Sequence, residues 1–364
     1  MKMNTKNNIY SVIKATGSYI PEKIIQNSDF LNNVFYDANG KIIEVPNEEI
    51  IQKFKKITNI SERRYINDDY VTSDIAHIAA ENAFVSSGID RETIDYLIVA
   101  HNFGDVKVNN IRSDFVPSLA ARVKHKLGIK NPYCAAYDVI FGCPGWLQGV
   151  IQANYYIKSG DAKRVLVIGS EALSRVSDPH DRDSMIYSDG AGAVILEALE
   201  SDEPVGILSH GVRSDTYTEA HYLWMNKTYN PDTDNDDLYL KMNGRKLYEY
   251  ALNNVPLLVK QCIEKADLTL DKISKVLLHQ ANEKMDDAIL QRVFSLYEQA
   301  KIPEGIMPMI IDKLGNSSVA TIPILLDLIL KGNLSEHDIL PGDNIVLASV
   351  GAGMNINAVC YRMV

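Results

Sequence analysis

One cysteine in this chain occupies a position that favours nucleophilic chemistry. Cys143 lies between an apolar, strand-like run over 137–142 and Pro144, which precedes a predicted helix over 145–159. Proline is favoured at the first helical position, so we expect Cys143 at the N-cap, facing free backbone N–H groups and the positive end of the helix dipole. Both features favour the thiolate, which is the nucleophilic form. From this junction alone, a buried structural cysteine is the alternative.

Two other polar residues occupy comparable junctions. His279 follows the apolar run 276–278 and precedes a helical stretch, and Asn316 lies in a turn-like segment ahead of an apolar helix. Taken singly, a hydrogen-bonded core histidine and a turn asparagine explain them. Together, an imidazole N–H and an amide N–H form two neutral donors that can stabilise a thioester enolate without protonating it. Cysteine, histidine and asparagine therefore indicate a site for carbon–carbon bond formation.

The chain repeats its own plan at about half its length. Segments 81–102 and 260–282 share the order helix, turn, strand, and the Val/Ile-rich run 164–173 matches 344–353. Strands of this type, alternating with amphipathic helices, predict an α/β fold. We predict two pseudo-symmetric halves: residues 1–200 carry Cys143, and residues 201–364 carry His279 and Asn316. Their packing would bring the three junctions into one cleft.

Length, charge and cysteine usage narrow the possible classes of function. The chain has 364 residues and a net charge of −10, which argues against nucleic acid but leaves room for an acidic protein partner at a local basic patch. No apolar stretch is long enough to span a bilayer and the start lacks a signal-peptide segment, so a cytoplasmic protein is expected. The four cysteines are widely separated and lack metal-binding spacing, so no metal is expected.

Four segments, in order and at suitable spacing, carry a family resemblance: 135–153, 164–198, 277–285 and 314–323. They resemble the β-ketoacyl-acyl-carrier-protein synthase III family of thiolase-fold condensing enzymes, and the resemblance runs from about residue 13 to 363. It implies a thiolase-like fold with layered α-β-α-β-α architecture, and a homodimer.

The resemblance also implies roles for individual residues. Cys143 would accept the acyl group, and His279 and Asn316 would promote decarboxylation. The backbone N–H groups of Cys143 and Ala352 would form the oxyanion hole. The implied reaction condenses an acyl thioester with malonyl-acyl carrier protein, giving a β-ketoacyl thioester that initiates fatty-acid synthesis. Coenzyme A or carrier thioesters are then substrates, and neither metal nor redox cofactor is expected.

Two further assignments concern partners of the chain. Phe115 matches an aromatic residue of the dimer contact that closes the neighbouring subunit's acyl pocket, although ordinary interface packing also explains it. Lys284 matches a basic position used to dock the acidic carrier protein, although a solvated surface lysine is the simpler alternative.

The sequence departs from the family pattern in three places. Segment 47–65 places Lys53 and Ile57 where bacterial housekeeping enzymes carry a Trp and an Arg that clasp the adenine of coenzyme A. The sequence therefore does not decide whether the chain binds a primer attached to coenzyme A. Segments 32–46 and 215–237 resemble inserts that would reshape the entrance, the acyl pocket or the dimer surface.

Two alternative functions remain open at this point. One is a secondary-metabolite enzyme that joins another nucleophile, or a preformed ketoacyl chain, to the acyl-cysteine. The other is a catalytically silent subunit that binds carrier protein. Because Cys143, His279 and Asn316 are all present, the catalytic interpretation is favoured.

Overall fold

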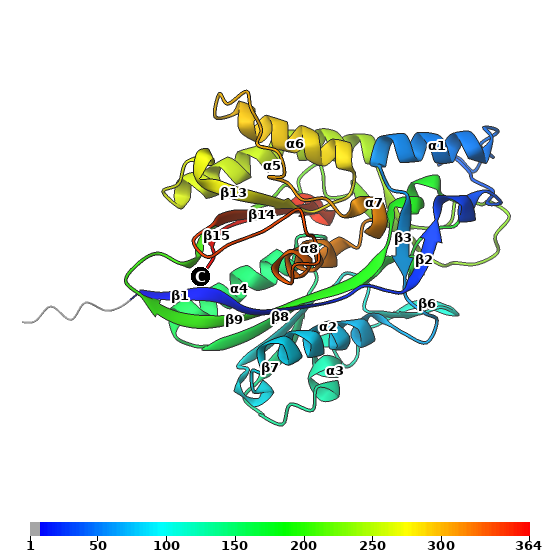
Figure 1. Cartoon of the computed structure of the whole chain (residues 1–364). Helices are drawn as coiled ribbons and strands as arrows, with labels where there is room; N and C mark the ends of the chain where they lie inside the picture. The colour runs from blue at the N-terminus through cyan, green and yellow to red at the C-terminus, as the bar shows by residue number, and fades with distance from the viewer. Residues whose placement is uncertain (1–7) are drawn as a thin grey trace, which may run out of the picture.

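The computed structural model describes residues 8–364, which form two β-sheets and the helices that cover and separate them (Figure 1). The first sheet has the strand order β1-β9-β8-β4-β7 and the second has the order β10-β15-β14-β13. The strands of the first sheet are β1 (Asn8–Tyr19), β4 (Tyr96–Ala100), β7 (Ala135–Val139), β8 (Arg164–Ala172) and β9 (Asp189–Ser201). Those of the second are β10 (Gly206–Ser214), β13 (Ile273–Leu278), β14 (Asn344–Gly351) and β15 (Asn355–Arg362).

Three small two-stranded sheets lie outside the two large ones. They pair β2 (Lys23–Gln26) with β3 (Glu62–Tyr65), β5 (Asp105–Lys107) with β6 (Asn110–Asp114), and β11 (Leu223–Asn226) with β12 (Tyr239–Met242). The helices are α1 (Asn47–Thr58), α2 (Thr72–Ser87), α3 (Leu119–Lys126), α4 (Gly145–Ser159), α5 (Gly244–Lys265), α6 (Glu283–Ser295), α7 (Ile311–Leu314) and α8 (Thr321–Leu330). Within residues 8–364, no helix combines the length and apolar character needed to cross a membrane.

The two sheets share one topology. In the first, β4 runs parallel to β8, β8 is antiparallel to β9, and β9 is antiparallel to β1. In the second, β13, β14, β15 and β10 follow the same order with the same directions. The matches detected along the chain therefore correspond to equivalent strands, β4 with β13 and β8 with β14. The first sheet adds β7 beyond β4, as an edge strand.

Five layers follow from this arrangement. Helices α5 and α6 lie outside the second sheet, α4 and α8 lie between the sheets, and α2 and α3 lie outside the first (Figure 1). Helix α8 has the sequence TIPILLDLIL and is buried over most of its length. An all-round apolar helix requires burial on every side, which the position between two sheets supplies. The predicted layered thiolase-like architecture is confirmed.

Candidate active site

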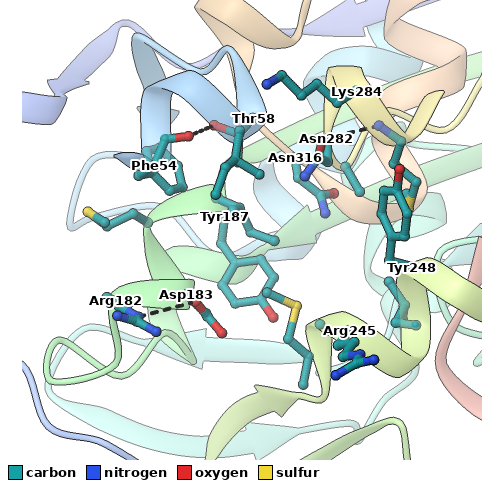
Figure 2. Close-up of a pocket in the computed structure, with 18 of the residues that line it drawn as sticks. Phe54, Thr58, Arg182, Asp183, Tyr187, Arg245, Tyr248, Asn282, Lys284 and Asn316 are labelled. Carbon is teal, nitrogen blue, oxygen red and sulfur yellow. Dashed lines mark hydrogen bonds and ion pairs between the residues drawn. The ribbon is translucent and has the colours of Figure 1, made fainter. Parts of the chain in front are cut away.

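One cavity of about 1320 Å³ is lined by Cys143, His279 and Asn316 together. Its other walls come from α1, the segment before β9, the β11–β12 hairpin and the first turns of α5 and α6 (Figure 2). The cysteine follows the end of β7 in the first half, and the histidine follows β13 in the second. The structure thus brings the three predicted residues to one cavity between the halves.

Cys143 lies one residue earlier relative to its helix than we predicted. Helix α4 begins at Gly145, as expected, but its N-cap is Pro144. The reason is that the Pro144 carbonyl accepts the first helical hydrogen bond, from Gln148 N at 2.9 Å. The sulfur still lies beside the start of the helix, on a half-buried side chain.

The surroundings of Cys143 favour the thiol over the thiolate at rest. Burial raises the pKa of Cys143 to about 11, and the charge of buried Glu171 adds to the rise. A hydrogen bond from Ser318 Oγ, 3.4 Å from Cys143 Sγ, acts in the opposite direction and lowers the pKa. The helix terminus alone therefore does not ionise the thiol, contrary to expectation, and attack must be accompanied by transfer of the thiol proton.

The backbone of the turn after β14 lies directly against the nucleophile. A Cβ atom on Gly351 would come within 2.4 Å of Cys143 N, and one on Gly142 would come within 2.7 Å of Ala352 N. Gly142 also has a φ of +67°, which favours glycine. These two glycines allow the Cys143 and Ala352 backbones to approach closely, as an oxyanion hole built from both N–H groups requires.

His279 is neutral in this site. Its backbone N–H donates to Ala348 O at 2.9 Å, which fixes the residue to the end of β14. Burial lowers the pKa of His279 to about 4. Within the described chain its Nδ1 atom is buried without a hydrogen-bond partner. The imidazole therefore offers one N–H donor and no positive charge at physiological pH.

Asn316 is oriented as a donor toward the cavity. Its Oδ1 atom accepts a hydrogen bond from Ser318 N at 2.8 Å, so its amide NH2 group remains for a ligand. Backbone bonds from Asn316 N to Ile186 O and from Ser188 N to Asn316 O hold the residue against the strand start at β9. His279 and Asn316 thus both line the cavity wall, where Figure 2 labels Asn316.

The predicted partner-facing residues lie at different places. Lys284 is exposed at the cavity mouth, in the first turn of α6. Phe115 is outside the cavity lining of its own chain and stacks on His101, with ring centroids 5.9 Å apart. Its role toward a second subunit remains a prediction.

Comparison with known proteins shows the family of this chain. The family model for 3-oxoacyl-[acyl-carrier-protein (ACP)] synthase III matches residues 137–216, and the model for the C-terminal part of that family matches residues 263–363. The beta-ketoacyl-[acyl-carrier-protein] synthase III of Staphylococcus aureus (strain JH1) is 34% identical over 351 residues, which is 96% of this chain and 98% of that protein. The chain belongs to the 3-oxoacyl-[acyl-carrier-protein] synthase III family.

Solved structures place this synthase in the same fold. The beta-ketoacyl-[acyl carrier protein] synthase III of Thermus thermophilus superposes with a TM-score of 0.79 at 30% identity, covering 97% of this chain and 99% of that one. The priming beta-ketosynthase of the R1128 polyketide pathway superposes equally well, with a TM-score of 0.79 at 23% identity and coverage of 100% and 99%. The synthase is therefore a thiolase-fold condensing enzyme, an acyltransferase.

The two inserts of this synthase meet at one loop beside the cavity. From the first insert, Tyr36 N donates to His180 O at 3.0 Å; from the second, Thr228 Oγ1 donates to Asp178 Oδ1 at 2.8 Å. Asp178 also pairs with the fully buried Lys241 of β12. This loop leads directly to Arg182, which lines the cavity. The inserts therefore shape the cavity wall.

The predicted lining by the second insert holds in part. Leu223 lines the main cavity. Its neighbours Tyr222, Trp224 and Met225 instead line a separate, open hollow of about 680 Å³. The alternation of side chains along the strand accounts for Tyr222 and Trp224, which point to the face opposite Leu223. Met225 shares the face of Leu223 by this alternation, yet it also borders the hollow.

Sequence reasoning missed a buried polar group behind the nucleophile. Glu171 and Asn102 connect through Ser318 to Cys143, yet none of the three lines the cavity. The signal was available, because Glu171 is the one acidic residue of a mostly apolar strand, RVLVIGSEAL. An acidic residue in such a strand is buried, and buried acids are rare without a specific partner.

Proposed function

We propose that this synthase carries out a decarboxylative Claisen condensation on Cys143. The observation that carries this proposal is the single cavity in which a cysteine thiol faces two neutral donors, His279 and Asn316. In the first half-reaction, Cys143 Sγ bonds to the acyl carbon of a thioester. The thioester C–S bond breaks, and the leaving thiol takes up the cysteine proton.

The second half-reaction uses the same cavity. A malonyl thioester binds with its carbonyl oxygen toward His279 and Asn316, and loss of CO2 leaves an enolate held by their N–H groups. The enolate carbon attacks the acyl-Cys143 carbonyl, whose oxygen points at the backbone N–H groups of Cys143 and Ala352. The C–S bond then breaks, which releases a β-ketoacyl thioester and the free cysteine. The electron pair comes from decarboxylation, so the proposed steps require neither metal nor redox cofactor.

We further propose acyl carrier protein as the partner that delivers the malonyl group. The chain is acidic overall, yet the exposed cationic side chains that line the cavity outnumber the exposed carboxylates: Lys53, Lys56, Arg182, Arg245 and Lys284 against Glu49, Asp183 and Glu249. A local positive rim on an acidic protein favours an acidic partner and guides its approach. Lys53 and Ile57 supply no stacking ring for adenine, which favours carrier-bound over coenzyme A-bound primers.

A panel of acyl donors tests this function. With malonyl-acyl carrier protein as extender, we expect β-ketoacyl products, detected by mass, from both carrier-bound and coenzyme A-bound primers, with the carrier-bound primers preferred. Lys284→Glu should lower kcat/KM for malonyl-carrier roughly 2- to 10-fold. This loss should become larger as the salt concentration falls, because less salt screens the charges. The matched control is Lys272→Glu, an exposed lysine outside the cavity lining. No β-ketoacyl product from any donor would contradict the proposal.

We propose that the synthase is a cytoplasmic homodimer. All four cysteines are unpaired, as in a reducing compartment.

The edge strand β7 has a free side, and the apolar side chains near it are unusually exposed: Val116 at 86%, Tyr133 at 89% and Ile140 at 61%. Unpaired strand edges with exposed apolar groups promote pairing with another chain. Light scattering should therefore give the mass of two chains, and Ile140→Glu should reduce it; a wild-type monomer at micromolar concentration would contradict the proposal.

A further inference from the structure

A chain of hydrogen bonds connects Cys143 to three residues that do not line the cavity. Ser318 Oγ donates to Cys143 Sγ at 3.4 Å. Asn102 Nδ2 lies 3.2 Å from Ser318 Oγ and 2.6 Å from Glu171 Oε2, and donates to both. The backbone N–H of Asn102 donates to Glu171 Oε1 at 3.3 Å. Four residues from distant parts of the sequence thus form one connected network.

The chemistry of the groups fixes the direction of each hydrogen bond. Burial raises the pKa of Glu171 to about 7, so this group is a carboxylate at the alkaline pH where Cys143 ionises. A carboxylate only accepts, so Glu171 turns the NH2 group of Asn102, and not its carbonyl oxygen, toward itself. The second N–H of that NH2 group then donates to Ser318 Oγ. Because Ser318 Oγ already accepts from Asn102, its own proton is free to point at the sulfur.

Burial and backbone conformation support a fixed arrangement. Glu171 is fully buried and Ser318 is 4% exposed, so solvent has little access to these two ends of the network, while Asn102 between them is partly buried. Ser318 has a φ of +54°, a left-handed conformation that is uncommon outside glycine. Such residues collect at functional sites, where the surrounding structure holds them in place. Here the unusual backbone carries the hydroxyl that contacts the nucleophile.

We propose that Ser318 is a positioning residue whose hydroxyl, directed by Asn102 and Glu171, stabilises negative charge on Cys143 Sγ. This inference rests on the proposed function, because the sulfur carries such charge when it attacks the acyl donor and again when the β-ketoacyl product leaves. A hydrogen bond donated to an ionised sulfur is stronger than one donated to a thiol. The contribution is therefore largest when the thiolate forms.

The network orients groups and does not pass protons. The NH2 group of Asn102 donates one N–H to Ser318 Oγ and the other to Glu171 Oε2. Because the amide nitrogen only donates, it cannot carry a proton from Ser318 to Glu171. The other titratable groups around the pair are Tyr187 and His279 near the sulfur, and His101 and Asp189 near the carboxylate. None of them has a hydrogen bond to Ser318 Oγ within the described chain.

The test measures the pH dependence of Cys143 alkylation by iodoacetamide, with the modified peptide identified by mass. Ser318→Gly removes the hydroxyl and also relieves the left-handed backbone; Ser318→Ala removes the hydroxyl alone. We expect both variants to move the alkylation midpoint upward by about one pH unit, roughly the effect of one hydrogen bond to a charged group. The matched control is Ser317→Ala, the adjacent buried serine, whose hydroxyl lies 3.4 Å from that of Thr321. It should leave the midpoint unchanged.

A double-variant cycle tests the direction imposed by Asn102. Asn102→Ala should raise the midpoint in the wild type and have no further effect in the Ser318→Gly background, because Asn102 acts through that hydroxyl. An unchanged midpoint in a folded Ser318→Gly protein would overturn the proposal, as would equal shifts from Asn102→Ala in both backgrounds. Alkylation requires no condensation, so these outcomes are distinct from a failure of the proposed reaction, which the donor panel detects.

Discussion

Cys143→Ala should lower the condensation rate by on the order of 10⁴-fold or more, because no other thiol of the described residues lines the cavity. The other three cysteines, Cys134, Cys262 and Cys360, are buried in the core and do not line the cavity. An acyl donor bound in the cavity therefore cannot reach these three thiols, whereas Cys143 lines the cavity. The measurement is product formation from an acyl thioester and malonyl-carrier.

The same variant should retain decarboxylation of malonyl-carrier. In the proposed mechanism His279 and Asn316 bind the malonyl carbonyl, and neither depends on the sulfur for its position. His279 N donates to Ala348 O, and Asn316 Oδ1 accepts from Ser318 N. Released CO2 with acetyl-carrier as product reports this half-reaction alone. Cys134→Ala is the control for loss of a thiol, and it should condense at the wild-type rate. Substantial condensation by Cys143→Ala would remove the basis for an acyl-enzyme.

Either His279→Ala or Asn316→Ala should leave acylation of Cys143 detectable while slowing decarboxylation about 10²- to 10³-fold. Each removes one donor to the enolate oxygen, and losses of this size are typical for such donors in sites closed to water. His279→Gln and Asn316→Asp separate shape from hydrogen bonding: the glutamine keeps an N–H donor, whereas the aspartate replaces the donor with an acceptor. We expect partial rescue from the first and none from the second. Normal decarboxylation in both alanine variants would contradict the assignment.

The pH dependence of decarboxylation follows from the state of His279. Its pKa is lowered to about 4, so it stays neutral as the pH falls from 7.5 to 5.5. A histidine with an ordinary pKa near 6.5 would become mostly charged over that interval. The wild-type decarboxylation rate should therefore show no transition near pH 6.5. A transition at that pH, absent from His279→Gln, would mean that the imidazole titrates normally.

The fold could be predicted to a large extent because its signals are local and repeated. Strands such as β8 and β14 are continuous apolar runs, and helix α4 has the predicted limits, Gly145–Ser159. The repeated topology of the two sheets explains why the chain resembles itself at half its length. The cap of α4 was displaced by one residue, because its position depends on which carbonyl accepts the first helical bond.

The sequence predicted the site residues that line the cavity, but not the buried residues behind them. Cys143, His279 and Asn316 follow recognisable strand or turn signals, and they do line one cavity. The state of the thiol was not predictable, because burial and the charge of Glu171 raise its pKa and both depend on distant segments. The contact of Ser318 with the sulfur joins residues 175 positions apart, which no local pattern encodes.

The central claim is that Cys143 carries the acyl chain between the two half-reactions, and intact-protein mass spectrometry tests it most directly. Incubation with an acyl-carrier or acyl-coenzyme A donor should add the mass of one acyl group per chain, mapped to the peptide that contains Cys143. A chase with malonyl-carrier should remove that mass and release the β-ketoacyl product. Absence of an adduct from every donor, or an adduct that persists through the chase, would contradict the account.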